Sequence, residues 1–407
     1  MKKGSELTEN WFVSLYNFLD EVKDKDKHVE KVTFHDVTLR DGEQQAGIIF
    51  RKDDKIEIAR MLDEAGVSRI EAGMPAVSQE EMEAVMAITQ CGLDAKIFSF
   101  ARCMKKDVDL ALACDVDGVV MEIPSSDHLL KYGYGWKLEK AIDFSVEATN
   151  YAAEHGLHVA FFTIDSTRAK FDTFWNIIES VATKGHMDSY VLVDTFGVCT
   201  PEATRYLVNE IKKRIDKPIE IHCHNDFGLA VANSIAGVMS GAEIIHSTVN
   251  AIGERSGNAS FEEVAAALEI LYDIKTDVKF EKLRLLSKIV EERSLIKMPP
   301  QKPIVGDKIF TTESGIIAGW WDRASKVKRP LEVFPLNPEF LGSNEVKIAL
   351  GKGSGSASII YRLKELGLRI PSEEKIDQIL RKVKLLSEEK KRLLTDEEFK
   401  SIINKLE

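Results

Sequence analysis

The feature that most constrains this chain is a regular alternation of short apolar runs with helical patterns between residues 32 and 248. Eight runs have the length and composition of buried strands: 32–37, 69–72, 96–101, 118–123, 158–164, 189–194, 219–224 and 243–248. Helical patterns lie between them at 53–65, 79–89, 138–155, 171–184, 201–215 and 230–240. Eight alternations in roughly 270 residues predict an α/β fold, a (β/α)8 TIM barrel. The alternative is an open doubly wound sheet, but no Gly-x-Gly-x-x-Gly turn opens a helix here.

The alternation covers only part of the 407 residues, so we expect three regions. Residues 1–29 form an N-terminal extension with an amphipathic helical pattern at 9–23. Residues 30–275 form the barrel, and residues 276–407 form a smaller α+β accessory region with a linker. The accessory region shows a helical pattern at 280–294, a proline-rich linker at 298–303, a Gly/Ser-rich stretch at 351–356 before a helix at 357–366, and a charged helical tail at 372–407.

Composition excludes several classes of protein. The net charge of −11 and the sequence pI of about 5.5 argue against a general binder of nucleic acid or of membrane surfaces. No apolar run approaches the roughly 18 residues that a membrane span needs, and no apolar segment of a secretory signal follows the N-terminus. The five cysteines are scattered and odd in number, which favours reduced thiols and a cytoplasmic location.

Two histidines mark a candidate metal site. Residues two apart on a strand share a face, so His222 and His224 point the same way from one strand end. In a barrel the chemistry lies at the carboxyl ends of the strands, where Asp41 and the carbonyl oxygen of Asn258 could complete the shell. Mixed nitrogen and oxygen ligands suit Zn, Mn or Mg. Alternatively, the histidines are a hydrogen-bonded pair, and Asn258 only caps the helix that begins near Ser260.

Three further residues at strand ends suggest how a substrate is held. Arg40 can stabilise a developing enolate or alkoxide oxygen, although Arg40 and Asp41 could also be a simple surface pair. Glu71 is embedded in an apolar strand and needs a partner; Arg40 is the obvious candidate, and another base is the alternative. Thr195 ends the sixth strand and can offer its hydroxyl group to a carboxylate.

Five segments together resemble one family: Asp-x-Thr-Leu-Arg-Asp-Gly-Glu-Gln at 36–44, Ile-Glu-Ala-Gly-x-Pro at 70–75, Asp-Thr-x-Gly at 194–197, His-x-His-Asn-Asp-x-Gly-Leu-Ala-x-Ala-Asn at 222–233 and Asn-x-Ile-Gly-Glu-Arg-x-Gly-Asn at 250–258. They are similar to the metal-dependent TIM-barrel family that contains 2-isopropylmalate, homocitrate and citramalate synthases and HMG-CoA lyase. The match covers roughly residues 30–270. It continues weakly through 334–339 and 350–355, which resemble accessory subdomains of the synthases.

The resemblance assigns roles to the site residues. It implies that Asp41, His222 and His224 bind a divalent metal (Mn, Mg or Zn), with Asn258 ligating or nearby. Arg40, Gln44 and Thr195 would hold a 2-oxo acid, and Glu71 would support Arg40. The partners implied are an acyl-CoA and a 2-oxo acid, and the chain would be a homodimer, because the accessory segment of these synthases reaches a partner's barrel.

The chain departs from the family pattern where proton transfer is expected. Ile164 stands at the family's glutamate position at the end of the fifth strand. Thr312 and Ile317 replace two histidines of a Thr-His-x-x-Gly-Ile-His segment, and Gly353 and Ser356 stand where the synthases often have His and Arg. The groups that could substitute as acid or base are Glu313, Asp165 and His128.

The function expected from this resemblance is a Claisen-type condensation of an acyl-CoA with a 2-oxo acid. A carbon–carbon lyase that acts on a 3-hydroxy acid or its CoA ester is the alternative, and a metal-binding homologue without catalysis is the third. Ala160, Phe162 and Ile164 share one strand face, which predicts an apolar pocket wall and poor use of 2-oxoglutarate. Two alternatives remain: a shifted register that turns these residues to a helix, or a cation such as Arg102 or Arg168 in the pocket.

Overall fold

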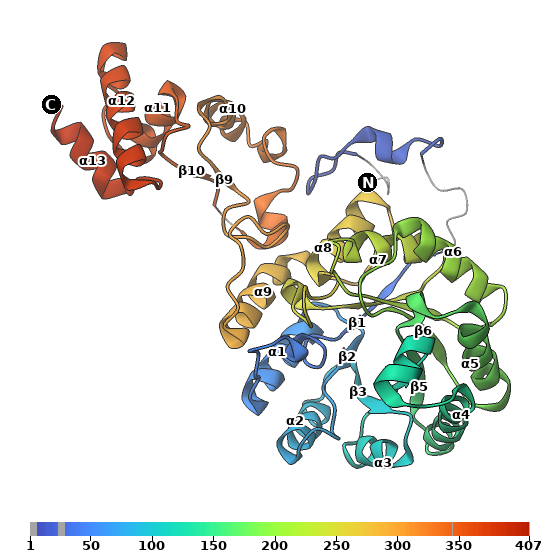
Figure 1. Ribbon diagram of the computed structural model, residues 1–407. Helices are drawn as coiled ribbons and strands as arrows, with labels where there is room; N and C mark the ends of the chain where they lie inside the picture. The colour runs from blue at the N-terminus through green and yellow to red at the C-terminus, as the bar shows by residue number, and fades with distance from the viewer. Residues whose placement is uncertain (1–5, 23–28, 344, 407) are drawn as a thin grey trace. The chain divides into compact units, whose positions relative to one another are not determined.

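The computed structural model describes residues 6–22, 29–343 and 345–406. Within these residues, parallel strands form a closed barrel in the order β1 to β8, and helices surround it (Figure 1). The strands are β1 (Thr33–Asp36), β2 (Arg69–Glu71), β3 (Lys96–Arg102), β4 (Gly118–Pro124), β5 (His158–Ile164), β6 (Ser189–Asp194), β7 (Ile219–Cys223) and β8 (Ile244–Ser247). The predicted TIM barrel is confirmed.

The helices of the barrel follow the predicted pattern with one addition. They are α1 (Lys52–Glu64), α2 (Gln79–Thr89), α3 (Lys105–Ala113), α4 (Leu138–Glu154), α5 (Phe171–Lys184), α6 (Pro201–Lys212), α7 (Ala230–Met239), α8 (Phe261–Ala266) and α9 (Phe280–Ser294). Helix α3 was not predicted, because Val108 and Ala111 are the only apolar residues that it buries and its apolar stripe is therefore narrow.

The barrel interior has an apolar half and a polar half. Strands β3 to β6 contribute an apolar cluster: Phe98, Phe100, Val120, Ala160, Phe162, Val191 and Val193. Strands β7, β8, β1 and β2 contribute buried titratable side chains: Glu220, His222, His246, His35 and Glu71. Because a buried charge needs a partner, this division gathers the polar groups of the interior where they can satisfy one another.

The N-terminal segment differs from the prediction. Among residues 6–22 the structure has only a short 3-10 helix (Leu15–Phe18) instead of an amphipathic helix over 9–23; residue 23 lies outside the described residues. Trp11 pairs with Leu336 and packs edge-on against Phe340, with the ring centroids 5.8 Å apart. Trp11 therefore packs against residues of the C-terminal region, while Leu7, Phe12 and Leu15 are exposed rather than gathered on a helix face.

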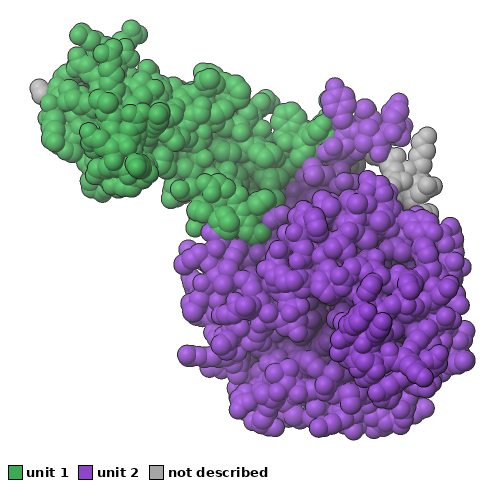
Figure 2. All heavy atoms as spheres, in the orientation of Figure 1, with its two compact units in different colours: residues 1–15, 299–407 green, residues 16–298 purple. Residues whose placement is uncertain are grey.

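The chain divides into two compact units, coloured separately in Figure 2. The barrel unit comprises Tyr16–Met298, and the other unit comprises Met1–Leu15 with Pro299–Glu407. The division falls after Met298 rather than after residue 275, because α9 packs against α1 and Arg293 of α9 pairs with Glu57 of α1.

The second unit is mainly helical in its described part. Its elements are β9 (Thr311–Thr312), α10 (Gly315–Lys326), β10 (Lys347–Ile348), α11 (Ser356–Glu365), α12 (Glu373–Lys390) and α13 (Asp396–Asn404). β9 and β10 are parallel, and α11, α12 and α13 share an apolar core that contains Leu363, Val383 and Phe399. No helix in the described part of the chain has the length and apolar character needed to cross a membrane.

Candidate active site at the carboxyl ends of the strands

Asp41, His222 and His224 come together at the mouth of the barrel. Asp41 follows β1, His222 lies in β7, and His224 follows that strand directly. His222 Nε2 lies 3.2 Å from Asp41 Oδ2 and 3.3 Å from His224 Nε2, while His224 Nε2 lies 3.7 Å from Asp41 Oδ2. All three side chains are buried. The predicted convergence of two imidazoles and a carboxylate is therefore present.

Asn258 belongs to the same cluster. Its Nδ2 donates to Asp41 Oδ1 at 3.1 Å, and its buried Oδ1 has no hydrogen-bond partner among the described residues. The helix-cap interpretation is wrong, because Ser260 is the residue that precedes α8 and the Asn258 side chain faces Asp41 instead. The preceding Gly257 has a φ of +82°, and a Cβ there would lie 1.8 Å from the carbonyl oxygen of Ala251.

These residues fit a divalent cation. Ligand atoms about 2.1 Å from an ion are about 3.4 Å apart in a tetrahedral shell and about 3.0 Å apart in an octahedral one, which brackets two of the three distances in the cluster. Burial lowers the pKa of His222 and lowers that of His224 to about 4, despite the nearby Asp41 carboxylate. Both imidazoles are therefore neutral near pH 7, as metal ligation requires. The orphaned Asn258 oxygen adds a further donor.

A chain of hydrogen bonds behind His222 determines which of its two ring nitrogens carries the hydrogen. The Glu220 carboxylate can only accept, so the His246 Nε2 that lies 2.6 Å from it is the donor. The neutral His246 then accepts at Nδ1, and His222 Nδ1, 3.3 Å away, donates to it. His222 Nε2 is left without a hydrogen and presents its lone pair toward Asp41 and His224.

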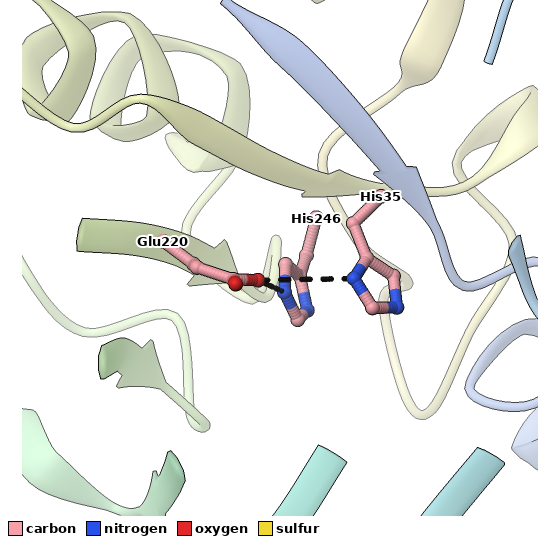
Figure 3. Close-up of side chains that lie close together, drawn as sticks. All are labelled: His35, Glu220 and His246. Carbon is pink, nitrogen blue, oxygen red and sulfur yellow. Dashed lines mark hydrogen bonds and ion pairs between the residues drawn. The ribbon is translucent and has the colours of Figure 1, made fainter. Parts of the chain in front are cut away.

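His35, Glu220 and His246 form a second buried cluster of possible ligand atoms (Figure 3). The rings of His35 and His246 stack, with centroids 4.4 Å apart and planes 26° apart. An imidazole donates its lone pair in its ring plane, and two stacked rings whose planes differ by only 26° do not direct their lone pairs at one ion within bonding distance of both. Arg69 and Ser189 already bind the other oxygen of Glu220. This cluster therefore serves as a hydrogen-bonded support and not as a second metal site.

Arg40 spreads its guanidinium group over the mouth of the barrel. Its Nε donates to Glu71, and its Nη1 donates to Asp41 Oδ2 at 3.0 Å and to Gln44 Oε1 at 3.3 Å. The group lies 4.2 Å from the ring centroid of Phe100. Its Nη2 is buried and has no partner among the described residues. The contacts leave one donor nitrogen for a substrate oxygen.

Glu71 is the expected partner of Arg40. Burial alone would raise the pKa of Glu71, but the charge of Arg40 and the nearby imidazole of His35 outweigh burial and lower the pKa to about 2. The Glu71–Arg40 pair is thus ionised at any physiological pH. Glu71 fixes the plane of the guanidinium group, as predicted from its position in an apolar strand.

The hydroxyl group of Thr195 has a hydrogen available for a substrate. Its Oγ1 accepts from the backbone N–H of Asp165 at 2.7 Å, so its hydroxyl hydrogen can point elsewhere. Arg255 donates to the backbone carbonyl of Thr195 and pairs with Asp226, which fixes the loop.

Comparison with known proteins identifies the family. The HMGL-like family model matches residues 31–290, and the homocitrate synthase post-HMGL domain-like model matches residues 304–391. The chain belongs to the HMGL-like family.

Three relatives of this HMGL-like protein come from Methanocaldococcus jannaschii. Homocitrate synthase AksA is 42% identical, over 93% of this chain and 91% of its own length. The 2-isopropylmalate synthase is 41% identical, over 92% and 71% of the two chains, and (R)-citramalate synthase CimA is 41% identical, over 87% and 70%. Among solved structures, the HMG-CoA lyase of Bacillus subtilis superposes with a TM-score of 0.60 at 21% identity, covering 66% of this chain and 96% of the lyase.

In this HMGL-like chain the wall formed by β5 is apolar, as predicted. Ala160 and Phe162 lie in the interior cluster, and Ile164 packs against it. The shifted-register alternative is wrong, because the ring centroid of Phe162 lies 5.1 Å from that of His222, inside the barrel. Arg102 and Arg168 are engaged elsewhere: Arg102 holds Asp107, and Arg168 holds Asp165, each through two nitrogens.

The three groups expected to substitute for the missing acid and base lie in different surroundings. Asp165 is buried with a φ of +65° and binds Arg168 and Ser126. His128 is exposed. Glu313 belongs to the other compact unit, where it accepts from the backbone N–H of Gly353 at 2.6 Å. Sequence reasoning missed Glu220, His246, His35 and Glu122; Glu220 could have been found, because it lies two residues before His222 on the same strand face.

Proposed function

We propose that this protein is a divalent-metal-dependent synthase that condenses an acyl-CoA with a 2-oxo acid. The observation that carries the proposal is the juxtaposition of the Asp41–His222–His224 cluster with a buried Arg40 that has one donor nitrogen left over. The relatives that share about 42% identity and bear the names of homocitrate, 2-isopropylmalate and citramalate synthases support it.

The chain's own residues would orient the oxo acid and stabilise charge. A divalent ion (Mn, Mg or Zn) held by Asp41, His222 and His224, with Asn258 beside them, would supply a Lewis acid that polarises the oxo carbonyl group. Thr195 would donate its hydroxyl hydrogen to the carboxylate of the oxo acid. Arg40 Nη2 would donate to the oxygen on which negative charge develops, and Glu71 would keep the guanidinium group in place.

The synthase direction is favoured over the lyase alternative by the C-terminal region. Residues 304–391 match a domain model that is described as following the HMGL domain in homocitrate synthase. The resemblance to solved HMG-CoA lyases is a resemblance of fold at 21% identity. We further propose that the protein is a cytoplasmic homodimer, which light scattering of the purified full chain would test.

A thiol-release assay tests the function. The metal-loaded protein should release free thiol from acetyl-CoA when pyruvate, 2-oxoisovalerate, oxaloacetate or 2-oxoglutarate is added, and the condensed hydroxy acid should appear by mass spectrometry. Cleavage of 3-hydroxy-3-methylglutaryl-CoA without condensation would overturn the synthase assignment in favour of the lyase. Absence of both activities with metal bound would favour a homologue without catalysis.

A further inference from the structure

Glu122 is the exception in the apolar half of the barrel interior. It lies near the carboxyl end of β4, two residues after Val120, which belongs to the interior apolar cluster; both side chains therefore face the same way. Among the described residues, Glu122 forms no ion pair within 4 Å, although its side chain is half-buried. Removing a carboxylate from water without an ionic partner costs folding free energy, so a residue that is kept in such a position is a candidate for a functional role.

The neighbours of Glu122 place it beside the proposed site. In the sheet it is paired with Arg102 of β3 and with Phe162 of β5. The Phe162 ring lies against both His222 and Arg40, with its centroid 5.1 Å from the His222 ring centroid and 6.0 Å from Arg40 Cζ. Phe162, the sheet neighbour of Glu122, thus lies beside both the Asp41–His222–His224 cluster and Arg40.

The charged groups around Glu122 are committed to other partners. Arg40 pairs with Glu71 and Asp41, Arg102 pairs with Asp107, and among the described residues neither arginine forms an ion pair with Glu122. The hydroxyl group of Tyr134 donates to Glu122 Oε1 at 3.0 Å. Burial and the charge of Asp107 raise the pKa of Glu122, against the Tyr134 hydrogen bond and the charges of Arg40 and Arg102, and burial prevails. A raised pKa makes a carboxylate a stronger base.

We propose that Glu122 is the base that removes a proton from the carbon next to the thioester carbonyl of the acyl-CoA. The inference rests on the proposed synthase function and supplies the group that the apolar Ile164 cannot. Ile164 of β5 is paired in the sheet with Pro124 of the neighbouring strand β4. Glu122 lies on β4 two residues before Pro124.

The condensation step transfers one proton to Glu122 and forms one C–C bond. Glu122 takes the proton, the electron pair of the broken C–H bond forms the new C–C bond with the oxo carbon, and the π pair of the oxo group moves to its oxygen. That oxygen takes a proton from solvent, and Glu122 returns its own proton to solvent. Water then hydrolyses the thioester, and the thiol of CoA leaves.

Glu122→Gln tests the assignment. With the oxo acid that gives the highest wild-type rate, kcat should fall by about 10²-fold or more, because a positioned base contributes roughly 10²–10⁴-fold. Metal affinity, measured by calorimetry with Mn²⁺, and the melting temperature should not change. Asp109→Asn is the matched control, since Asp109 also accepts from a tyrosine hydroxyl, that of Tyr151 at 2.8 Å, but on the outer surface.

Tyr134→Phe gives a second, independent measurement. The Tyr134 hydrogen bond stabilises the ionised form of Glu122, so its loss should raise the pKa of Glu122 and move the acid limb of the kcat profile to higher pH. Arg40, Arg102 and Asp107 also face Glu122 and are unchanged in this variant. Tyr151→Phe, the control, should leave the profile where it is. This measurement still decides the matter if Glu122→Gln fails to fold.

Two outcomes would overturn the assignment in different ways. If wild type releases thiol and Glu122→Gln remains within tenfold of it, or if Tyr134→Phe leaves the acid limb in place, Glu122 is not the base and the synthase function stands. If metal-loaded wild type releases no thiol with any oxo acid of the panel, the proposed function and the role of Glu122 fall together.

Discussion

Arg40 uses its Nε and Nη1 to bind Glu71 and Asp41 and leaves Nη2 for a substrate. This arrangement predicts the effect of a conservative substitution. Arg40→Lys retains the positive charge but cannot hold Glu71, Asp41 and a substrate oxygen at the same time. We expect kcat to fall by about 10²-fold or more, as in the loss of an oxyanion donor, while the metal content stays equal to that of wild type. Steady-state kinetics and metal analysis check this.

Arg293→Lys is the matched control, because Arg293 pairs with Glu57 on the exposed side of the barrel. It should leave the rate unchanged. Activity of Arg40→Lys within about tenfold of wild type, or roughly 1.4 kcal/mol, would mean that Arg40 does not stabilise the developing charge.

In the proposed metal site Glu220 would act through His246 and His222, so we expect its substitution to lower the metal affinity. In Glu220→Gln the amide NH2 can donate to His246 Nε2, which reverses the direction of both hydrogen bonds and leaves a hydrogen on the His222 nitrogen that faces Asp41. Loss of such outer partners typically costs 10–100-fold in metal affinity. Calorimetry with Mn²⁺ or Zn²⁺ measures it; an affinity within threefold of wild type would refute the relay.

At the scale of the element, β5 sets the expected choice of oxo acid. Ala160, Phe162 and Ile164 offer no partner to a second carboxylate, and Glu122 on the adjacent strand would repel one. We expect pyruvate and 2-oxoisovalerate to give higher kcat/KM values than oxaloacetate and 2-oxoglutarate. Steady-state rates with these four acids decide it. If 2-oxoglutarate is the best substrate, the apolar-wall argument is wrong.

The elements of the barrel could be predicted because their local patterns are clear. β5, β6, α2 and α5 have the predicted bounds: the two strands are short, almost wholly buried apolar runs, and the two helices bury one face at the helical period. The conformation around Trp11 could not be predicted, because Trp11 has its partners Leu336 and Phe340 more than 300 positions away in the chain. Helix α10 lies in a stretch where turn residues and aromatics obscured the helical period.

The candidate site was predictable only where its residues lie in recognisable motifs. Asp41, His222, His224 and Asn258 lie at or just after the carboxyl ends of strands, so closing the barrel brings them together. Glu122 and His246 lie inside runs that read as ordinary apolar strands. Their importance depends on which strands become neighbours when the barrel closes, and a local pattern does not contain that information.

At the scale of the whole molecule, the cluster of Asp41, His222, His224 and Asn258 draws its residues from the first strand and the last two strands of the barrel. Asp41 follows β1, His222 and His224 belong to the end of β7, and Asn258 follows β8, while β1 and β8 are the pair that closes the barrel. An ion bound by these residues would contact the first and the last strands of the barrel unit at once. Because the chain separates Asp41 from the other three residues by about 180 positions and more, binding is expected to favour the folded barrel strongly.

Removal of the metal should therefore lower the thermal stability of the barrel. A ligand present at 100 times its Kd stabilises the folded state by about 2.7 kcal/mol, and each kcal/mol shifts Tm by about 2–4 °C in chains of 150–250 residues. We expect a chelator to lower the Tm of wild type by about 5–10 °C and added Mn²⁺ or Zn²⁺ to restore it. Calorimetric scans with and without EDTA measure the shift.

His222→Ala separates this effect from nonspecific effects of the chelator. The variant lacks one ligand, so its purified form should contain less metal than wild type, and EDTA should change its Tm little. His128→Ala, which alters an exposed histidine outside the cluster, should respond to EDTA as wild type does. Equal metal content in wild type and His222→Ala, together with equal EDTA shifts, would place the bound ion elsewhere, because an ion held by Asp41, His222 and His224 cannot be indifferent to the loss of the imidazole that lies closest to the carboxylate.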